Sequence, residues 1–218
     1  MRSSYLMKKD LVRAEQTFKE AIRVDERSIK ARYALAGFYR GSGKTELAES
    51  ELIEVTKIDH KNPNSYIALG DVYVSLKRME DAEKQFIKSI EVEPKGVPAQ
   101  IHLGDFYLIW GKKEKVIETY QKAIEADEKN ISARAKLAEV YLNDNKPDKA
   151  SEIVEKILEI NPKSHDGTFL KGRLHLAKRE YDEAINLLQA YLKDNPKSFL
   201  VRDGGSQKYL SWTQRLKE

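Results

Sequence analysis

A pattern of large and small residues recurs every 34 residues along most of the chain, and it restricts the fold more than any other feature. Two groups within residues 63–96 have the spacing of a buried helix face, first Tyr66, Leu69, Gly70 and Tyr73, and then Ala82, Phe86 and Ser89. Pro94 follows the second group and ends its helix. This stretch therefore predicts two helices joined by a short turn.

The same two-helix pattern returns when the sequence is shifted by 34 residues in either direction. The matching places of other copies hold Leu35, Ala36 and Tyr39, then Leu103, Gly104 and Tyr107, then Leu137, Ala138 and Tyr141, and finally Gly172, Ala184, Leu188 and Pro196. Tyr5, Ala14, Phe18 and Ala21 form part of an earlier copy. Such a period is typical of a solenoid, in which each hairpin covers its apolar side by stacking on the next one.

The pattern resembles the tetratricopeptide repeat, whose motif is an aromatic residue, Leu-Gly, Tyr, a turn Gly, Ala, an aromatic residue, Ala and Pro. The resemblance implies an all-α, right-handed superhelical solenoid of antiparallel helix hairpins. It places a partial repeat at 1–28, full repeats at 29–62, 63–96, 97–130, 131–164 and 165–198, and a tail or capping helix at 199–218. The sequence departs from the motif at Lys171 (Leu expected), at His175 (Tyr expected), and at Glu26, His60 and Glu128 (Pro expected).

The eighth place of every full repeat holds a small residue. These residues are Ala36, Gly70, Gly104, Ala138 and Gly172. A small side chain lets the two helices of a hairpin approach closely, so we expect a larger one to overpack the contact.

Both ends of the chain depart from the regular array. Met1 corresponds to the seventh place of a repeat, so we expect a first helix of about half the usual length before a second helix from Leu11 to Val24. This start fits a fragment of a longer array, or a frayed natural end. Near the other end Gly204 and Gly205 disfavour a helix. Residues 206–217 predict a short amphipathic helix that caps the last hairpin or docks on another chain.

Composition excludes several classes of function. The 39 basic and 35 acidic residues are interspersed, so their net charge of +4 does not favour nucleic acid. An RNA-reading helical repeat would have a 35-residue period and a basic groove, and the chain has neither. The absence of cysteine excludes disulfides and thiolate zinc sites. Neither a membrane-spanning run nor a signal peptide is present, so we expect a soluble protein. The compartment stays open between the cytoplasm, which is favoured, and the periplasm.

No motif of catalysis, cofactor binding or metal binding is present. The histidines, at 60, 102, 165 and 175, match no compact metal spacing. The sequence has neither a phosphate-binding loop nor a nucleophile elbow. We therefore expect no enzyme, no cofactor and no metal.

The resemblance implies that the first helix of each repeat lines a concave groove. The fifth places are Tyr33, Ile67, Ile101, Ala135 and Phe169; the ninth are Gly37, Asp71, Asp105, Glu139 and Arg173; the twelfth are Arg40, Val74, Leu108, Leu142 and Leu176. The acids of three successive repeats would then form a ladder across an apolar floor. The alternative is that these acids are solvated or bind within the array.

These residues predict a noncatalytic scaffold for an extended or helical peptide that carries apolar and basic residues. Family members that hold the C-terminal carboxylate of chaperones use Lys and Asn at the fifth and ninth places, where this chain has Ile and Asp. Chaperone tails are therefore not the expected ligand. The alternative hypothesis is a structural spacer, or a self-associating part of a longer array.

Overall fold

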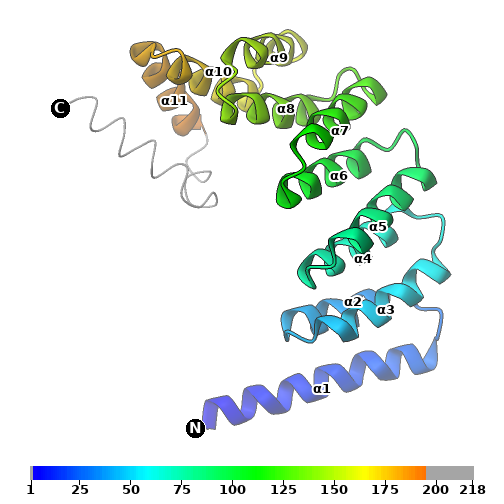
Figure 1. The fold of residues 1–218 in the computed structure, drawn as a ribbon. Coiled ribbons are helices and arrows are strands. Elements are labelled where there is room, and N and C mark those ends of the chain that lie inside the picture. Colours follow the sequence, from blue (N-terminus) through cyan, green and yellow to red (C-terminus); the bar gives the residue numbers. More distant parts are fainter. Residues whose placement is uncertain (1, 195–218) are drawn as a thin grey trace. The chain divides into compact units, whose positions relative to one another are not determined.

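The computed structural model describes residues 2–194, and it describes side chains from residue 10 to residue 193. All regular structure in this range is α-helical, as predicted (Figure 1). The helices are α1 (Arg2–Val24), α2 (Ile29–Gly41), α3 (Thr45–Ile58), α4 (Pro63–Ser75), α5 (Met79–Val92), α6 (Val97–Trp110), α7 (Lys113–Ala126), α8 (Ile131–Asn143), α9 (Pro147–Ile160), α10 (His165–Ala177) and α11 (Tyr181–Asp194). The prediction for residues 199–218 lies outside the described residues.

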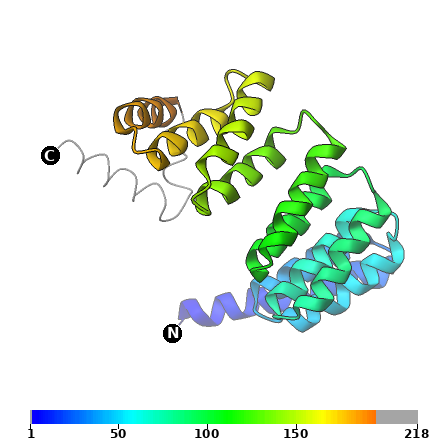
Figure 2. The ribbon, with the colours of Figure 1, turned by 45° about the horizontal axis from the view of Figure 1, so that its top comes forward.

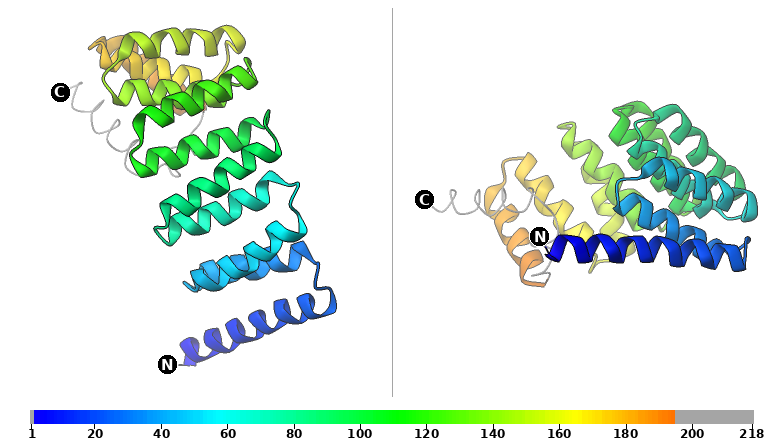
Figure 3. Two further views of the ribbon diagram at one scale, coloured as in Figure 1. Left: turned by 45° about the vertical axis from the view of Figure 1, so that its right-hand side comes forward. Right: turned by 90° about the horizontal axis from the view of Figure 1, so that it is seen from below.

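The helices alternate in a regular order that follows the sequence period. The first helices of the hairpins begin 34 residues apart, at Ile29, Pro63, Val97, Ile131 and His165. The chain divides between Thr119 and Tyr120 into two compact units. In the first unit α2 packs on α3 and α4 on α5, and in the second α8 packs on α9 and α10 on α11. Figures 2 and 3 show these antiparallel pairs from other sides.

A polar side chain just before most of the first helices fixes where they begin. Ser28, Asn62, Asn130 and Ser164 each accept a hydrogen bond from a backbone N–H of the first helical turn. These bonds satisfy donors that the helix itself leaves unpaired. Gly96 takes the equivalent place before α6, and Pro98 lies in the first turn of that helix.

The turn inside each hairpin uses one residue in the left-handed conformation. These residues are Gly43, Lys77, Gly111, Asn145 and Arg179, again 34 apart, with φ between 56° and 74°. Glycine adopts this conformation freely, but Lys77 and Arg179 carry a cost of roughly 1–2 kcal/mol each. They adopt it because the two helices on either side of the turn are packed against each other.

The predicted partial hairpin at the start of the chain is wrong, because α1 is one continuous helix from Arg2 to Val24. Lys9 has the place that the left-handed residue has in the other repeats, and here its backbone is helical. A left-handed lysine costs free energy, and the packing of the two helices beside the turn has to offset that cost. A helix of half length offers too little packing to offset a left-handed lysine, and residues 7–11 contain no glycine, asparagine or proline to end the helix.

The core of the first unit contains the close helix contact that the sequence predicts. A Cβ added to Gly70 of α4 would lie 2.8 Å from Cε1 of Phe86 in α5. Phe86 is fully buried, and the centroid of its ring lies 5.0 Å from that of Phe106 in α6. The missing side chain of Gly70 therefore makes room for the Phe86 ring.

The core of the second unit shows how the repeat tolerates Lys171 in place of leucine. Lys171 is exposed, whereas Leu170 is buried in a cluster with Ala138, Val154 and Ile157. The apolar residue of this repeat is therefore one position earlier in the sequence, and its side chain packs against α8 and α9.

Candidate functional site

Six of the predicted groove residues lie on two neighbouring first helices of the first unit, because α4 contacts α6. Ile101 and Val74 are half-buried, whereas Leu108 is 48% exposed and its neighbour Ile109 is 65% exposed. Asp71 and Asp105 are half-buried among them. Both exposed apolar side chains and half-buried carboxylates therefore occur on α4 and α6, and their use as a binding groove stays a prediction.

Not every predicted groove residue is accessible to a partner. Only 7% of Ile67 is exposed, so this side chain belongs mainly to the core. Tyr33 is half-buried, and its hydroxyl donates to Ser65 Oγ of α4 at 3.3 Å. Gly37 and Arg40 of α2 are exposed.

Asp71 lies in a mixed electrostatic environment. Burial raises the pKa of its carboxyl group, and the charges of His102 and Arg40 act in the opposite direction. These two residues lie on the helices on either side of α4, namely α6 and α2. The carboxylate is therefore incompletely solvated, so a cation from a partner would improve its surroundings.

In the second unit the ninth-place residues form a pair. Arg173 Nη1 of α10 lies 3.9 Å from Glu139 Oε1 of α8, and Arg173 Nη2 donates to Asn143 Oδ1 at 2.8 Å. The guanidinium also lies 6.0 Å from the centroid of the Phe169 ring, and Leu142 is half-buried. Glu139 thus interacts within the array. For this acid the structure agrees with the alternative interpretation, in which the acids bind within the array. A ladder that joins all three acids stays a prediction.

The sequence interpretation missed a second set of carboxylates, which we call the carboxylate clamps and define as Glu15, Glu49 and Glu83. Glu15 lies on α1, Glu49 on α3 and Glu83 on α5. Each carboxylate binds a basic side chain of the next repeat: Glu15 binds Lys44 at 2.9 Å, Glu49 binds Arg78 at 2.8 Å and Glu83 binds Lys115 at 2.6 Å. The hydroxyl of Tyr39 donates to Glu15 at 3.2 Å, and that of Tyr107 donates to Glu83 at 2.7 Å. The 34-residue spacing of the three acids is the signal that would have revealed them.

Hydrogen bonds from neighbouring side chains lower the pKa of two of these acids. Hydrogen bonds from Lys19, Lys44 and Tyr39 lower the pKa of Glu15 to about 2. Burial acts to raise the pKa of Glu83, but hydrogen bonds from Lys115 and Tyr107 outweigh it and lower the pKa. Both acids are therefore charged in the folded chain at pH values where the unfolded chain binds protons.

We expect the clamps to make stability depend on acidity. Because the folded pKa of Glu15 lies below its ordinary value of 4.5, its contribution is complete above that value and is lost as the pH falls toward 2. The variant E15Q/E83Q should melt below wild type at pH 6, and the gap should shrink steadily between pH 5 and pH 2.5. Thermal melts across this range measure it. E152Q, which changes an exposed acid of α9, is the control; an equal, pH-independent gap for the double variant would rule out the clamps.

Two further classes of site are absent from the described residues. None of the helices in this part of the chain combines the length and the apolar character needed to cross a membrane. No group of three or more His, Cys, Asp and Glu side chains between residues 2 and 194 is arranged to hold a metal ion.

Comparison with protein families gives two matches. A family model described as a tetratricopeptide repeat matches residues 63–95, which include α4 and α5. A model described as the anaphase-promoting complex, cyclosome, subunit 3 matches residues 111–191. No curated protein matches the chain.

Several solved structures share the fold. A structure of PilF from Pseudomonas aeruginosa is 18% identical with a TM-score of 0.64, and the match covers 97% of this chain and 93% of that one. PilW, described as a type IV pilus biogenesis factor, is 16% identical with a TM-score of 0.65 and coverage of 95% and 94%. YrrB, described as having an unusual peptide-binding site, is 19% identical with a TM-score of 0.53 and coverage of 84% and 94%. At these identities the likeness shows the fold alone.

Proposed function

This chain belongs to the tetratricopeptide-repeat family, and on that premise we propose that it is a noncatalytic scaffold that binds a polypeptide segment along its first helices. The observation that carries the proposal is the exposure of Leu108 and Ile109 beside the half-buried carboxylates of Asp71 and Asp105. Large apolar side chains that stay exposed in a cluster with charged groups are typical of an interaction surface. The peptide-binding site named for YrrB, a protein of the same fold, adds support.

The chemistry of this face defines the partner. An extended or helical segment with Leu, Ile or Phe would cover Leu108 and Ile109, and Lys or Arg in the same segment would pair with Asp71 and Asp105. We assign the main binding surface to α4 and α6, because Leu108 and Ile109 of α6 are large apolar side chains that stay exposed there.

The acids of this face provide the test. Random peptides displayed on phage and selected on the wild-type chain should be enriched in apolar and basic residues. D71N/D105N should bind such peptides roughly tenfold more weakly, if each ion pair with the partner contributes about 0.5–1 kcal/mol. The salt dependence of binding should also flatten. Adding Glu139→Gln should change little further, because Glu139 lies beside Arg173. Isothermal titration calorimetry measures the affinity of the wild type, the double variant and the triple variant.

The matched control is E46Q/E114Q, which removes the same charge from exposed positions on α3 and α7. Each single change at Asp71, Asp105 or Glu139 should keep the stability within about 0.5 kcal/mol of wild type. If the triple variant melts far below wild type while peptide binding is unaltered, the carboxylates brace the fold and the assignment is wrong. An equal loss of binding in the control would mean that the change in net charge alone accounts for the weaker binding.

Self-association is a second candidate function, and one observation favours it. Leu11 and Val12 of α1 are 47% and 54% exposed, whereas the other repeats have Glu46, Glu80, Glu114, Asp148 and Asp182 at the place of Val12. Light scattering over a range of concentrations separates the two candidates. A monomer at all concentrations would leave the peptide scaffold as the function.

A further inference from the structure

The fourth place of four repeats holds a long side chain that donates a hydrogen bond to the backbone. Each one reaches the carbonyl oxygen of the residue six places before it. Arg32 Nη2 donates to Glu26 at 3.0 Å, Tyr66 Oη to His60 at 3.0 Å, Gln100 Nε2 to Pro94 at 3.1 Å and Arg134 Nη2 to Glu128 at 2.6 Å. The side chains differ in chemistry but share length and a terminal donor, so this acceptor is a constant feature of the repeat.

The backbone that presents the acceptor is the same in the last described repeat. In all five turns the residue just before the first helix donates its N–H to the carbonyl three residues earlier: Ser28 to Asp25, Asn62 to Asp59, Gly96 to Glu93, Asn130 to Asp127 and Ser164 to Asn161. Pro162 therefore has the turn position that Glu26, His60, Pro94 and Glu128 have. Its carbonyl oxygen should point the same way.

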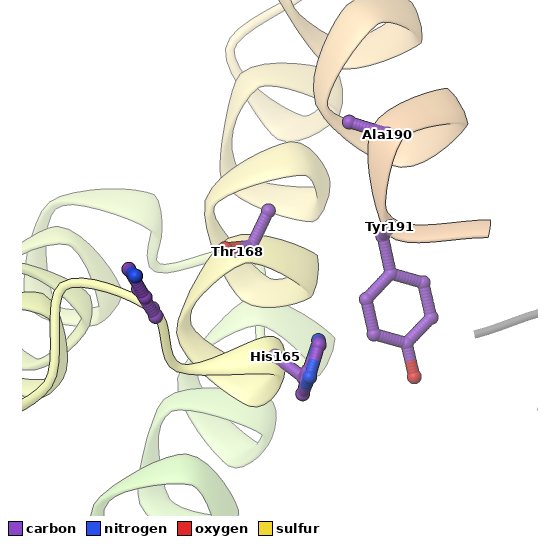
Figure 4. A pocket seen from close by; sticks show the side chains of 5 residues that line it. His165, Thr168, Ala190 and Tyr191 are labelled. Atoms are coloured by element: carbon purple, nitrogen blue, oxygen red, sulfur yellow. The ribbon is translucent and has the colours of Figure 1, made fainter. Parts of the chain in front are cut away.

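Thr168 has the fourth place of this repeat and is too short to reach that carbonyl. Its hydroxyl donates instead to the carbonyl of Ser164, four residues earlier, at 3.0 Å. A hollow of about 320 Å³ lies beside it, lined by Lys163, His165, Thr168, Ala190 and Tyr191. Figure 4 shows Thr168 and His165 of α10 facing Ala190 and Tyr191 of α11 across this hollow.

A second short residue widens the hollow on the side of α11. Ala190 has the place at which the other second helices carry Glu54, Lys88, Lys122 and Lys156. The rim is aromatic, because the His165 and Tyr191 rings lie edge to face with centroids 6.5 Å apart. The hollow thus has an aromatic and methyl-lined wall, and Pro162 directly precedes Lys163 of its lining in the sequence.

We propose that this hollow receives a tyrosine side chain of a polypeptide partner, with the ring against Ala190 and Thr168 and the hydroxyl donating to the carbonyl of Pro162. Tyr66 provides the internal example of this arrangement in α4. Lys163 in the lining disfavours an arginine, and the aromatic rim favours a ring over a glutamine. The inference rests on the proposed function, since it requires a polypeptide partner, but it uses a surface separate from Asp71 and Asp105.

The first experiment uses p-cresol, which is the tyrosine side chain alone, and toluene, which lacks only the hydroxyl. In two-dimensional NMR spectra of the full chain, p-cresol should shift the amide signals of residues 163–168, 190 and 191. Toluene should bind at least fivefold more weakly, because it leaves the carbonyl without a donor. Equal binding of the two probes, or shifts elsewhere only, would overturn the proposal.

Variants then close the hollow in two independent ways. Thr168→Tyr supplies the ring from the chain itself, and Ala190→Lys restores the long side chain of the other repeats; each should weaken p-cresol binding at least tenfold. The matched control Lys171→Gln changes an exposed residue of α10 outside the lining of the hollow and should bind p-cresol as wild type does. If Thr168→Tyr fails to fold, Ala190→Lys still decides the outcome. Unchanged binding in a folded closing variant would contradict the site.

The last step identifies the source of the tyrosine. Peptides selected on wild type and counter-selected on a folded closing variant should be enriched in tyrosine, and D71N/D105N should still bind them. Enrichment without tyrosine overturns this inference and leaves the proposed function standing, whereas failure of every selection counts against both. Tyr209→Ala in the full chain tests the chain's own tail. If it strengthens p-cresol binding severalfold, residue 209 competes for the hollow and the partner assignment is wrong.

Discussion

Replacing Phe86 by alanine is expected to lower the free energy of unfolding by about 3–5 kcal/mol, the largest effect of any single change considered. The Phe86 ring is fully buried, fills the space above Gly70 and packs on Phe106 of the next hairpin. Alanine would remove contacts on both sides and leave a cavity that the helices cannot close. Urea unfolding followed by circular dichroism measures the loss.

The control for this change is the next residue along α5. Ile87 is 42% exposed, so Ile87→Ala should cost about 1 kcal/mol or less. A similar loss for both variants would mean that removing a side chain anywhere on α5, and not the burial of the Phe86 ring, accounts for the effect. A wild-type midpoint for Phe86→Ala would show that α5 does not depend on this contact.

Gly70→Ala is expected to destabilise the chain by about 1–3 kcal/mol, although alanine is the better helix former. The new Cβ would lie 2.8 Å from Cε1 and 2.9 Å from Cζ of Phe86, whose ring is buried and packs on Phe106. Gly37→Ala is the matched control, because a Cβ there meets nothing within 4 Å. It should be neutral, or stabilising by about 0.5–1 kcal/mol.

A double variant tests the cause of this strain. Leucine at position 86 lacks the ring atoms that the new Cβ would meet, so Gly70→Ala should cost clearly less in an F86L background than in wild type. The two changes are in direct contact, and non-additivity of this sign is expected. Strict additivity would place the strain somewhere other than the Phe86 ring.

The helix pairs and their core could be predicted from the sequence because the 34-residue period reports the same contacts five times. Phe86, Gly70 and Leu103 are buried as their spacing indicates. The α1 helix could not be predicted in this way. Whether Lys9 turns or stays helical depends on how much packing a neighbouring helix supplies, and the repeat pattern does not contain that quantity. The shift from Lys171 to Leu170 likewise depends on packing against α8 and α9.

The candidate site was predictable in part. Leu108, which was predicted from the twelfth place of its repeat, is exposed. Ile67, which was predicted from the fifth place, is buried. Position in a repeat assigns a helix face, whereas exposure depends on the sizes of the side chains around it. The hollow beside Thr168 was missed for a related reason, since it arises from what a short residue leaves unfilled.

The carboxylate clamps affect which insertions and deletions of sequence the first unit can accept. The acid is supplied by one repeat and its tyrosine and basic partners by the next, and the Tyr–Glu separation is 24 residues at both Tyr39 and Tyr107. A 34-residue segment from the first unit therefore carries one half of the contact at each end. Copying or deleting such a segment rejoins matching halves, so whole-repeat duplication within this unit preserves every junction, whereas an insertion of any other length breaks one.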